Sequence, residues 1–211
     1  ETIMVVGFGQ GCDVLVFRTT EALAKLPKRM GVSGWVARRK PEPNYVKYLF
    51  WNGHLDLARG MRAEFDQKSA LTALYRNRKT ILGLVGGKCS KTGVVQFPKS
   101  EISVAQNDRT QGTQDDYPLA ERRARIMTYT ADTLTFSPVP PAYYGNVDFE
   151  EGGRIMMEFA DVEADDVVVG AAMRMMFRIK AVDENRGFTK YFWKAVPDYL
   201  AGEVQARAGA E

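Results

Sequence analysis

The sequence predicts a mainly β protein in which a short ribbon precedes a five-stranded barrel of OB type. Five strand-like apolar runs follow one another after residue 111, at 124–130, 143–149, 154–159, 172–179 and 188–196. The acidic segment 161–168 separates the third run from the fourth and is long enough for one or two helical turns. A connector at that point is typical of the OB barrel, and an open five-stranded sheet is the alternative.

The fourth run shows the clearest alternation. Apolar Met173, Met175, Phe177 and Ile179 alternate with Arg174, Met176, Arg178 and Lys180. A period of two indicates a half-buried strand. The sequence Glu-Glu-Gly-Gly at 150–153 predicts a hairpin turn between the second and third runs. We therefore expect one OB-fold domain over 111–200, followed by a flexible tail at 201–211.

Residues 1–19 are predicted to form a separate β-hairpin. Apolar runs at 2–6 and 14–17 flank the glycine-rich segment 7–11. Two strands lack a face to bury against, so such a hairpin is not stable alone. It must pack on the rest of this chain or belong to a sheet whose other strands lie elsewhere. The glycine spacing does not match the dinucleotide-binding fingerprint, and a strand follows it instead of a helix.

The segments between the hairpin and the barrel have weaker patterns. We expect the last strands of a larger domain over 1–24, a Pro- and Gly-containing linker over 25–43, a helical segment over 44–80 and a ribbon over 81–110. Within the ribbon, the apolar runs 81–85 and 94–97 are predicted as strands.

Composition excludes several classes of protein. The 211 residues contain no apolar run near the roughly 20 residues that a membrane helix needs, so no membrane partner is expected. Two cysteines, Cys12 and Cys89, exclude a disulfide-dense scaffold and suit the cytoplasm. Residues 1–110 carry a net charge of +9 and residues 111–211 a net charge of −6. An anionic partner is therefore expected to meet the first half.

The ribbon has the outline of a zinc ribbon without its ligands. Cys89 begins a turn in which the second cysteine of a C-x-x-C pair is replaced by Thr92. The second pair is expected after Pro98, where Ser103 and Gln106 stand. One thiolate does not replace the four ligands of a structural zinc site, so no metal and no cofactor are expected. Packing of Val85, Val95 and Phe97 would then have to hold the ribbon together.

Several segments resemble, in order, the zinc-ribbon/OB-fold accessory proteins of thiolase-superfamily enzymes. They are Gly-Gly-Lys-Cys-Ser-Lys-Thr-Gly-Val-Val-Gln-Phe-Pro at 86–98, Ser-Pro-Val-Pro-Pro-Ala-Tyr-Tyr-Gly at 137–145, Gly-Gly-Arg-Ile-Met-Met-Glu-Phe at 152–159, and Val-Gly at 169–170 with Met-Arg-Met-Met-Phe at 173–177. The resemblance implies N-terminal helices, a rubredoxin-like ribbon that is degenerate here, and an OB barrel. It also implies a thiolase-like condensing-enzyme chain or fused domain as partner in an oligomeric complex.

The hairpin is similar to the final hairpin of the thiolase fold, whose glycine loop lines the active site. The resemblance implies that Gly7, Phe8, Gly9 and Gly11 contribute backbone to an acyl pocket. Thiolases place a catalytic cysteine two residues before the first glycine, where this sequence has Val5. That difference favours the HMG-CoA-synthase or ketoacyl-synthase-III branch, whose catalytic Cys, His and Asn are not on this chain. The chain would thus be part of an acyltransferase and not catalytic alone.

Acyl-CoA or an acyl-carrier thioester is the substrate that the resemblance implies. Its phosphates need cations and its pantetheine arm needs a neutral groove. The residues expected to supply them are Arg76, Arg78, Lys79, Lys88, Lys91, Tyr143 and Tyr144. A purely structural scaffold is a second reading. A nucleic-acid-binding OB protein is a third, and the acidic second half argues against nucleic acid as a partner.

Overall fold

The computed structural model describes residues 1–26, 31–58, 70–106, 110–183 and 185–199. The chain divides into two compact units at residues 42 and 43. In the first unit, β1 (Thr2–Phe8) and β2 (Cys12–Arg18) form an antiparallel hairpin, which confirms the expected one. A 3-10 helix, η1 (Glu21–Lys25), and the short helix α1 (Gly31–Ala37) follow, so the range expected as a linker contains a helix.

The described residues at the start of the second unit form three short helices. They are α2 (Tyr45–Trp51), α3 (Leu71–Arg76) and α4 (Arg78–Gly83). The side chain of Asn44 caps α2 by accepting hydrogen bonds from the backbone N–H groups of Val46 and Lys47, at 3.0 and 3.3 Å. This satisfies two of the backbone donors that every helix start leaves open. No helix among the described residues is long and apolar enough to cross a membrane.

The prediction of a strand at 81–85 is wrong for residues 81–83. Ile81–Gly83 complete α4, and the chain turns at Leu84, which has a left-handed backbone with φ of 46°. A short apolar run fits a buried helix end as well as a strand, so its pattern alone does not decide. Leu84 is fully buried, and this burial offsets the cost of its backbone conformation.

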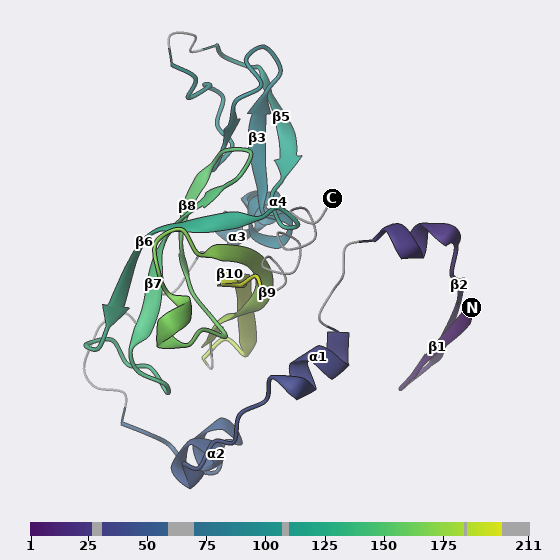
Figure 1. Ribbon diagram of the computed structural model, residues 1–211, viewed down its shortest axis with the longest axis vertical. Helices are drawn as coiled ribbons and strands as arrows, with labels where there is room; N and C mark the ends of the chain where they lie inside the picture. The colour runs from purple at the N-terminus through teal and green to yellow at the C-terminus, as the bar shows by residue number, and fades with distance from the viewer. Residues whose placement is uncertain (27–30, 59–69, 107–109, 184, 200–211) are drawn as a thin grey trace, which may run out of the picture. The chain divides into compact units, whose positions relative to one another are not determined.

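The ribbon is a three-stranded antiparallel sheet. Its strands β3 (Val85–Cys89), β4 (Val95–Gln96) and β5 (Gln114–Pro118) lie in the order β4-β3-β5. The third strand lies beyond residue 110, inside the range expected to belong to the OB domain. Figure 1 shows this sheet standing at one end of the barrel.

Five strands form the predicted OB-type barrel. They are β6 (Ala124–Asp132), β7 (Ala142–Phe149), β8 (Arg154–Glu158), β9 (Ala172–Asp183) and β10 (Phe188–Pro197), in the order β10-β9-β6-β7-β8. A parallel bridge between Phe159 and Ala195 closes the barrel by joining the end of β8 to β10. The connector before β9 contains one 3-10 turn, η3 (Ala164–Asp166). The mainly β fold class and the five strands are thereby confirmed.

Ribbon and barrel share one hydrophobic core. Leu84, Val95 and Leu119 from the ribbon side belong to the same buried cluster as barrel residues such as Ile126 and Met173. A backbone bridge joins Val95 to Gly152 in the β7–β8 turn. A side chain at Gly152 would press on the Val95 carbonyl oxygen, so the turn must be glycine there. The two sheets thus form one folded body.

Gly145 provides a direct test of barrel packing. A Cβ atom at this position would collide with the backbone carbonyl of Thr128 on the neighbouring strand β6. We expect Gly145→Ala to lower the free energy of unfolding of the barrel by about 1–3 kcal/mol, measured by denaturant unfolding. Gly11→Ala, where the structure leaves open space around the added carbon, is the matched control and should change it little. Equal stability of the two variants would contradict the close approach of β6 and β7.

Candidate functional site

The degenerate knuckle of the ribbon is built around Cys89 and three threonines. The buried Cys89 Sγ lies 3.2 Å from Thr113 Oγ1 and 3.4 Å from Thr110 Oγ1. It also accepts a hydrogen bond from the backbone N–H of Thr92 at 3.4 Å, and the two hydroxyls of Thr110 and Thr113 are 2.8 Å apart. Cys89 and Thr92 therefore have the spacing of the first ligand pair of a zinc ribbon, and Thr110 and Thr113 have the spacing of the second pair.

The expected position of the second ligand pair, at Ser103 and Gln106, is wrong. Ser103 and Gln106 do not face Cys89, and Thr110 and Thr113 stand there instead. Ser103 is buried in the preceding loop, where its backbone N–H donates to the Thr110 carbonyl at 2.9 Å. Two residues separate Cys89 from Thr92, and two residues separate Thr110 from Thr113. This repeated spacing is the signal in the sequence that could have located the second pair.

The knuckle does not fit a structural zinc ion. Zinc takes thiolate, imidazole or carboxylate ligands, and three of the four positions carry hydroxyls. Within the described part of the chain, no group of three or more His, Cys, Asp or Glu side chains is placed to hold a metal. The hydroxyls act on the thiol itself. Hydrogen bonds from Thr110, Thr113 and Thr92 lower the pKa of Cys89 from 9.0 to about 5, against the opposing effect of burial.

This pKa predicts a buried thiolate at neutral pH. In a Cys12→Ser background, the thiolate absorbance at 240 nm should titrate with a midpoint near pH 5, and Cys89→Ser should remove it. A depressed pKa stabilises the fold fully above the unfolded value near 9, and this contribution is lost as pH falls toward 5. Thr110→Val with Thr113→Val should therefore lower the melting temperature more at pH 9 than at pH 5.

The exposed Thr130→Val is the control for the threonine substitutions. A titration midpoint between 8 and 9 in the chain with both threonines intact would contradict the hydroxyl-stabilised thiolate.

The cations expected to meet CoA phosphate lie on α3, α4, β3 and the turn after β3, and the structure gives most of them partners within the chain. Lys79 Nζ is 2.6 Å from Asp116 Oδ2, and Lys99 Nζ is 2.6 Å from Oδ1 of the same carboxylate. The hydrogen bonds from Lys79 and Lys99 lower the pKa of Asp116 to about 2. Lys79 thus joins α4 to the ribbon sheet.

The remaining cations of this set are held less tightly. Arg78 lies over the ring of Tyr75 at 4.6 Å, and Arg76 donates to the Thr72 carbonyl at 3.3 Å. Lys88 lies over the ring of Tyr117 at 5.3 Å, and Arg122 contacts the same ring at 5.1 Å. Lys91 is exposed in the turn after β3. Sequence reasoning missed Lys99, Tyr117 and Arg122, because their relation to the cluster depends on strand pairing.

Tyr143 and Tyr144 lie at the other end of the barrel from the ribbon. Both begin β7, whose last residue, Phe149, leads into the turn that contacts the ribbon. Six strand residues span roughly 20 Å. Tyr143 packs against the barrel core, and Tyr144 is on the opposite face, paired with Glu158 of β8. The structure therefore does not bring the tyrosines and the cations to one place.

Gly7 and Phe8 end strand β1, paired with Asp13 and Cys12 of β2, and Gly9 and Gly11 lie in the turn of the β1–β2 hairpin in the first unit. Gly9 donates to the Gly11 carbonyl at 2.9 Å, and the side chain of Phe8 is 84% exposed. None of the three glycines has a described atom within 4 Å of where a Cβ would be, and none has a positive φ. Within the described residues, nothing in this chain requires glycine at these positions.

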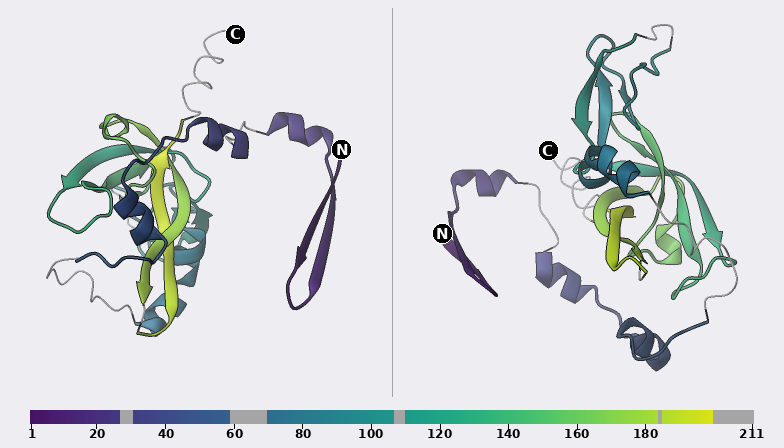
Figure 2. Two further views of the ribbon diagram at one scale, coloured as in Figure 1. Left: turned by 90° about the horizontal axis from the view of Figure 1, so that it is seen from below. Right: turned by 180° about the vertical axis from the view of Figure 1, so that it is seen from behind.

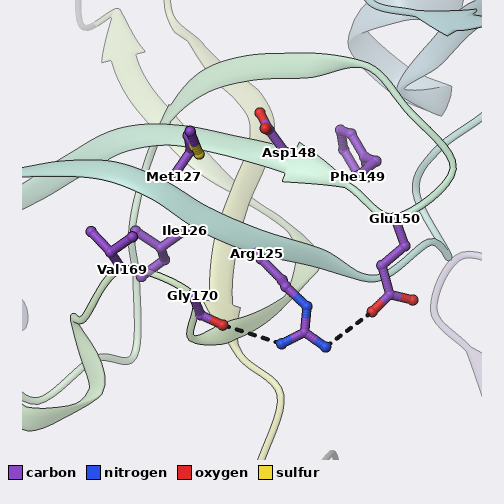
Figure 3. A pocket seen from close by; sticks show the side chains of 8 residues that line it. All are labelled: Arg125, Ile126, Met127, Asp148, Phe149, Glu150, Val169 and Gly170. Carbon is purple, nitrogen blue, oxygen red and sulfur yellow. Dashed lines mark hydrogen bonds and ion pairs between the residues drawn. The ribbon is translucent and has the colours of Figure 1, made fainter.

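The structure also contains a hollow of about 440 Å³ between β6, β7 and the loop before β9. Figure 3 shows Arg125 beside it, with its guanidinium 3.2 Å from the Gly170 carbonyl and 3.6 Å from Glu150. Met127 and Val169 form an apolar wall. Both carboxylates of its lining are in ion pairs, Asp148 with Arg154 and Glu150 with Arg125, and Arg125 thereby joins two loops. This arrangement joins the β7–β8 turn and the loop before β9 to β6.

Comparison with known proteins agrees with the fold. Residues 117–178 match the family model of the ChsH2 C-terminal OB-fold domain. A DUF35 domain-containing scaffold protein of Methanocaldococcus jannaschii is 26% identical over 126 residues, which cover 58% of this chain and 87% of that protein. One of Methanothermobacter thermautotrophicus is 27% identical over 117 residues, covering 54% and 86%.

Among solved structures, the Ltp2-ChsH2(DUF35) aldolase aligns with a TM-score of 0.45 and 14% identity over 62% of this chain and 96% of that one. The family match spans β6 to β8 and part of β9. The barrel is an OB-type fold, and its sequence is similar to the C-terminal OB-fold domain of ChsH2.

Proposed function

We propose that this chain is the accessory part of a thiolase-superfamily acyl-CoA condensing enzyme, of the HMG-CoA-synthase or ketoacyl-synthase-III type. Its hairpin completes a sheet of the condensing domain, and its ribbon and barrel stabilise the complex and help to bind acyl-CoA. The catalytic Cys, His and Asn belong to the rest of the enzyme. The relatives named as scaffold proteins and the match to the ChsH2 OB-fold domain support an accessory role.

The observation that carries this proposal is the exposure of both faces of the β1–β2 hairpin. The register places Ile3, Val5, Leu15 and Phe17 on one face and Met4, Val6, Val14 and Val16 on the other. All eight side chains are exposed. A strand pair that is apolar on both sides is typical of a sheet covered by layers on both faces. A thiolase-like domain with helices on both sides of its sheet would supply this environment.

The edges of the hairpin are also open. Its backbone hydrogen bonds run between β1 and β2, and the N–H of Thr19 closes the open end on the Glu1 carbonyl at 2.9 Å. An unpaired apolar edge is a template for strand addition. In the proposed complex, the glycine loop carrying Gly7, Phe8, Gly9 and Gly11 approaches the acyl group closely. The hairpin itself leaves open space around these glycines, which supports this role.

The ribbon contributes as a metal-free extension of the barrel. Its core residues and the Cys89 cluster replace the cohesion of a zinc site. The cations around Tyr117 and the exposed Lys91 are our candidates for contact with CoA phosphate. The uncharged loop before Tyr143 and Tyr144 is our candidate to flank the pantetheine arm.

A purely structural scaffold is the second candidate function. Two observations favour it. Lys79 is held in an ion pair with Asp116, and roughly 20 Å separate the ribbon end of β7 from the two tyrosines, so the expected CoA-binding residues do not lie together. A nucleic-acid-binding surface has less support. The cations of the aromatic β9–β10 hairpin are engaged by carboxylates, as in the pairs of Arg178 with Asp161 and Lys194 with Glu158.

The first test concerns the hairpin. We expect the full 211-residue chain to self-associate when expressed without its partner, because the hairpin exposes two apolar faces. Val5→Lys with Leu15→Glu makes one face polar, and Val6→Lys with Val14→Glu makes the other polar, each across a paired position. Each pair should weaken self-association, and all four changes together should give a monomer of 23.6 kDa by light scattering.

Val32→Lys with Val36→Glu in α1 is the matched control and should leave self-association unchanged. A monodisperse monomer of the unaltered chain would contradict the proposed insertion. An effect confined to one face would mean that the partner covers only that face.

The second test separates CoA binding from scaffolding. Lys88→Glu with Lys91→Glu should raise the acyl-CoA KM of the intact assembly several-fold at low salt and less at high salt, because exposed charges are screened. Arg38→Glu with Arg39→Glu reverses the same number of charges directly after α1 and is the control. If the KM responds to neither pair and not to Tyr143→Ala, the module is a scaffold and the CoA assignment is wrong.

A further inference from the structure

Helix α2 ends in a glycine cap. The backbone N–H of Gly53 donates to the Phe50 carbonyl at 3.1 Å, and the N–H of His54 donates to the Leu49 carbonyl at 2.9 Å. Gly53 has a left-handed backbone with φ of 70°. This is the Schellman arrangement, in which the residues after a helix satisfy carbonyls that its last turn leaves open. We call residues 52–54 the C-terminal cap of α2, and Figure 2 shows this short helix from two further sides.

Asn52 lies directly before the capping glycine. It is exposed, and its side-chain Nδ2 donates to the Tyr48 carbonyl at 2.8 Å. Asn52 and Gly53 form the one Asn–Gly pair in the sequence. An asparagine can react with its own main chain when the nitrogen of the next residue attacks the side-chain carbonyl carbon. Glycine favours this attack, because it has no Cβ to crowd the nitrogen and its backbone adopts many conformations.

The reaction needs no partner other than water. The Gly53 nitrogen gives up its proton and forms a bond to Asn52 Cγ, and the bond from Cγ to Nδ2 breaks. Nδ2 takes up a proton and leaves as ammonia, so that a five-membered succinimide ring remains. Water then opens the ring at either of its carbonyl carbons, which gives aspartate or isoaspartate. Neither product recovers ammonia, so the change runs in one direction.

The C-terminal cap prevents this reaction while it is formed. Ring closure needs Cβ of Asn52 and the nitrogen of Gly53 nearly eclipsed about the Cα–C bond of Asn52. The ψ angle of Asn52 is 4°, so the Gly53 nitrogen eclipses the backbone nitrogen of Asn52 instead. The N–H that must lose its proton is also held by the Phe50 carbonyl. The end of α2 must therefore open before the ring can form.

The structure indicates that this helix end opens readily. The helix has seven residues, and helices of this length are marginal without tertiary contacts. The ring of Phe50 contacts the ring of Phe136 in the β6–β7 loop edge to face, with centroids 6.2 Å apart. A contact of this kind contributes modestly, so it restrains the helix end without locking it.

We propose that Asn52 is a site of spontaneous deamidation, gated by opening of the C-terminal cap, and that its conversion unwinds the end of α2. In aspartate, a carboxylate replaces the donor to the Tyr48 carbonyl and lies at the negative end of the helix dipole. In isoaspartate, an additional methylene enters the main chain. The N–H groups of Gly53 and His54 then no longer reach their carbonyls.

The change alters an exposed apolar surface. Tyr45, Tyr48 and Trp51 of α2 have 68%, 53% and 53% of their surface exposed, and after deamidation they lie on a loosened helix. The inference rests on α2 alone. It holds whether or not the chain completes a condensing enzyme.

Asn77 is a matched control within the same chain. It ends α3 with a ψ of 19°, and its Nδ2 donates to the Ala73 carbonyl at 2.8 Å. The next residue is Arg78 instead of glycine. The full-length chain is incubated at neutral pH and analysed by peptide mapping with mass spectrometry. Aspartate and isoaspartate should accumulate at Asn52, and several-fold less of either should accumulate at Asn77.

Two variants test whether the helix end gates the reaction. Phe136→Ala removes the ring contact and should raise the rate at Asn52 roughly two- to tenfold, which is the range expected for one edge-to-face pair. Asn44→Ala removes the hydrogen bonds that begin α2 and should act in the same direction. Leu134→Ala, in the same loop as Phe136 and at a side chain that is 75% exposed, is the matched control and should leave the rate unchanged. In urea, which holds the cap open, the rate should be higher than in the native chain and equal for all variants.

The structural consequence is measured on the same samples. Hydrogen–deuterium exchange at 45–54 should be faster in the deamidated chain than in the fresh chain, and Asn52→Asp should reproduce part of this change.

Four results would overturn the proposal. They are equal rates at Asn52 and Asn77, equal rates at Asn52 in the native chain and in urea, and rates in the Phe136→Ala and Asn44→Ala chains that match the Leu134→Ala chain. The fourth is unchanged exchange at 45–54 after deamidation, which would mean that the helix keeps its end without the asparagine.

Discussion

The folded body of this protein depends on a single core that the ribbon and the barrel share. Leu84 is its anchor, because the left-handed turn there ends α4, starts β3 and buries the leucine completely. Leu119, which donates its N–H to the Leu84 carbonyl, and Val95 complete the ribbon side. Burying three such side chains contributes roughly 5–8 kcal/mol before conformational entropy is subtracted. The sequence-based expectation named Val85, Val95 and Phe97, of which Val95 and Phe97 pack on the core.

This shared core explains how a ribbon with one remaining cysteine keeps its shape. A zinc ion normally joins two knuckles, and here two other contacts do so. The hydroxyls of Thr110 and Thr113 contact the Cys89 sulfur, and the buried side chain of Gln96 holds the intervening loop. Gln96 donates to Ser100 and to the Ile102 carbonyl and accepts from the Val104 N–H. The ribbon is therefore a fixed extension of the barrel, and its cations are presented at a defined place.

Local patterns were enough to predict the barrel, and they failed where the answer depended on long-range contacts. Alternation in β9 and the Glu-Glu-Gly-Gly turn gave the strands, because a half-buried strand must alternate. The run 81–85 has no such period, and only burial of Leu84 decides that a helix ends there. Thr110 and Thr113 were missed because a hydroxyl is not expected as a substitute for a metal ligand. Tyr143 lies far from the cations because β7 runs away from the ribbon. The amino-acid composition does not determine the direction of a strand.

The β1–β2 hairpin, apolar on both faces, is the part of the chain that we propose completes a larger condensing enzyme. Native mass spectrometry of the assembly, purified through a tag on this chain and followed by hydrogen–deuterium exchange, tests it most directly. We expect a stoichiometric thiolase-like subunit or domain and slow exchange of the outer edge amides of both β1 and β2 in the assembly. A chain that purifies as a free monomer, or a complex in which the hairpin amides exchange as fast as in the isolated chain, would contradict it.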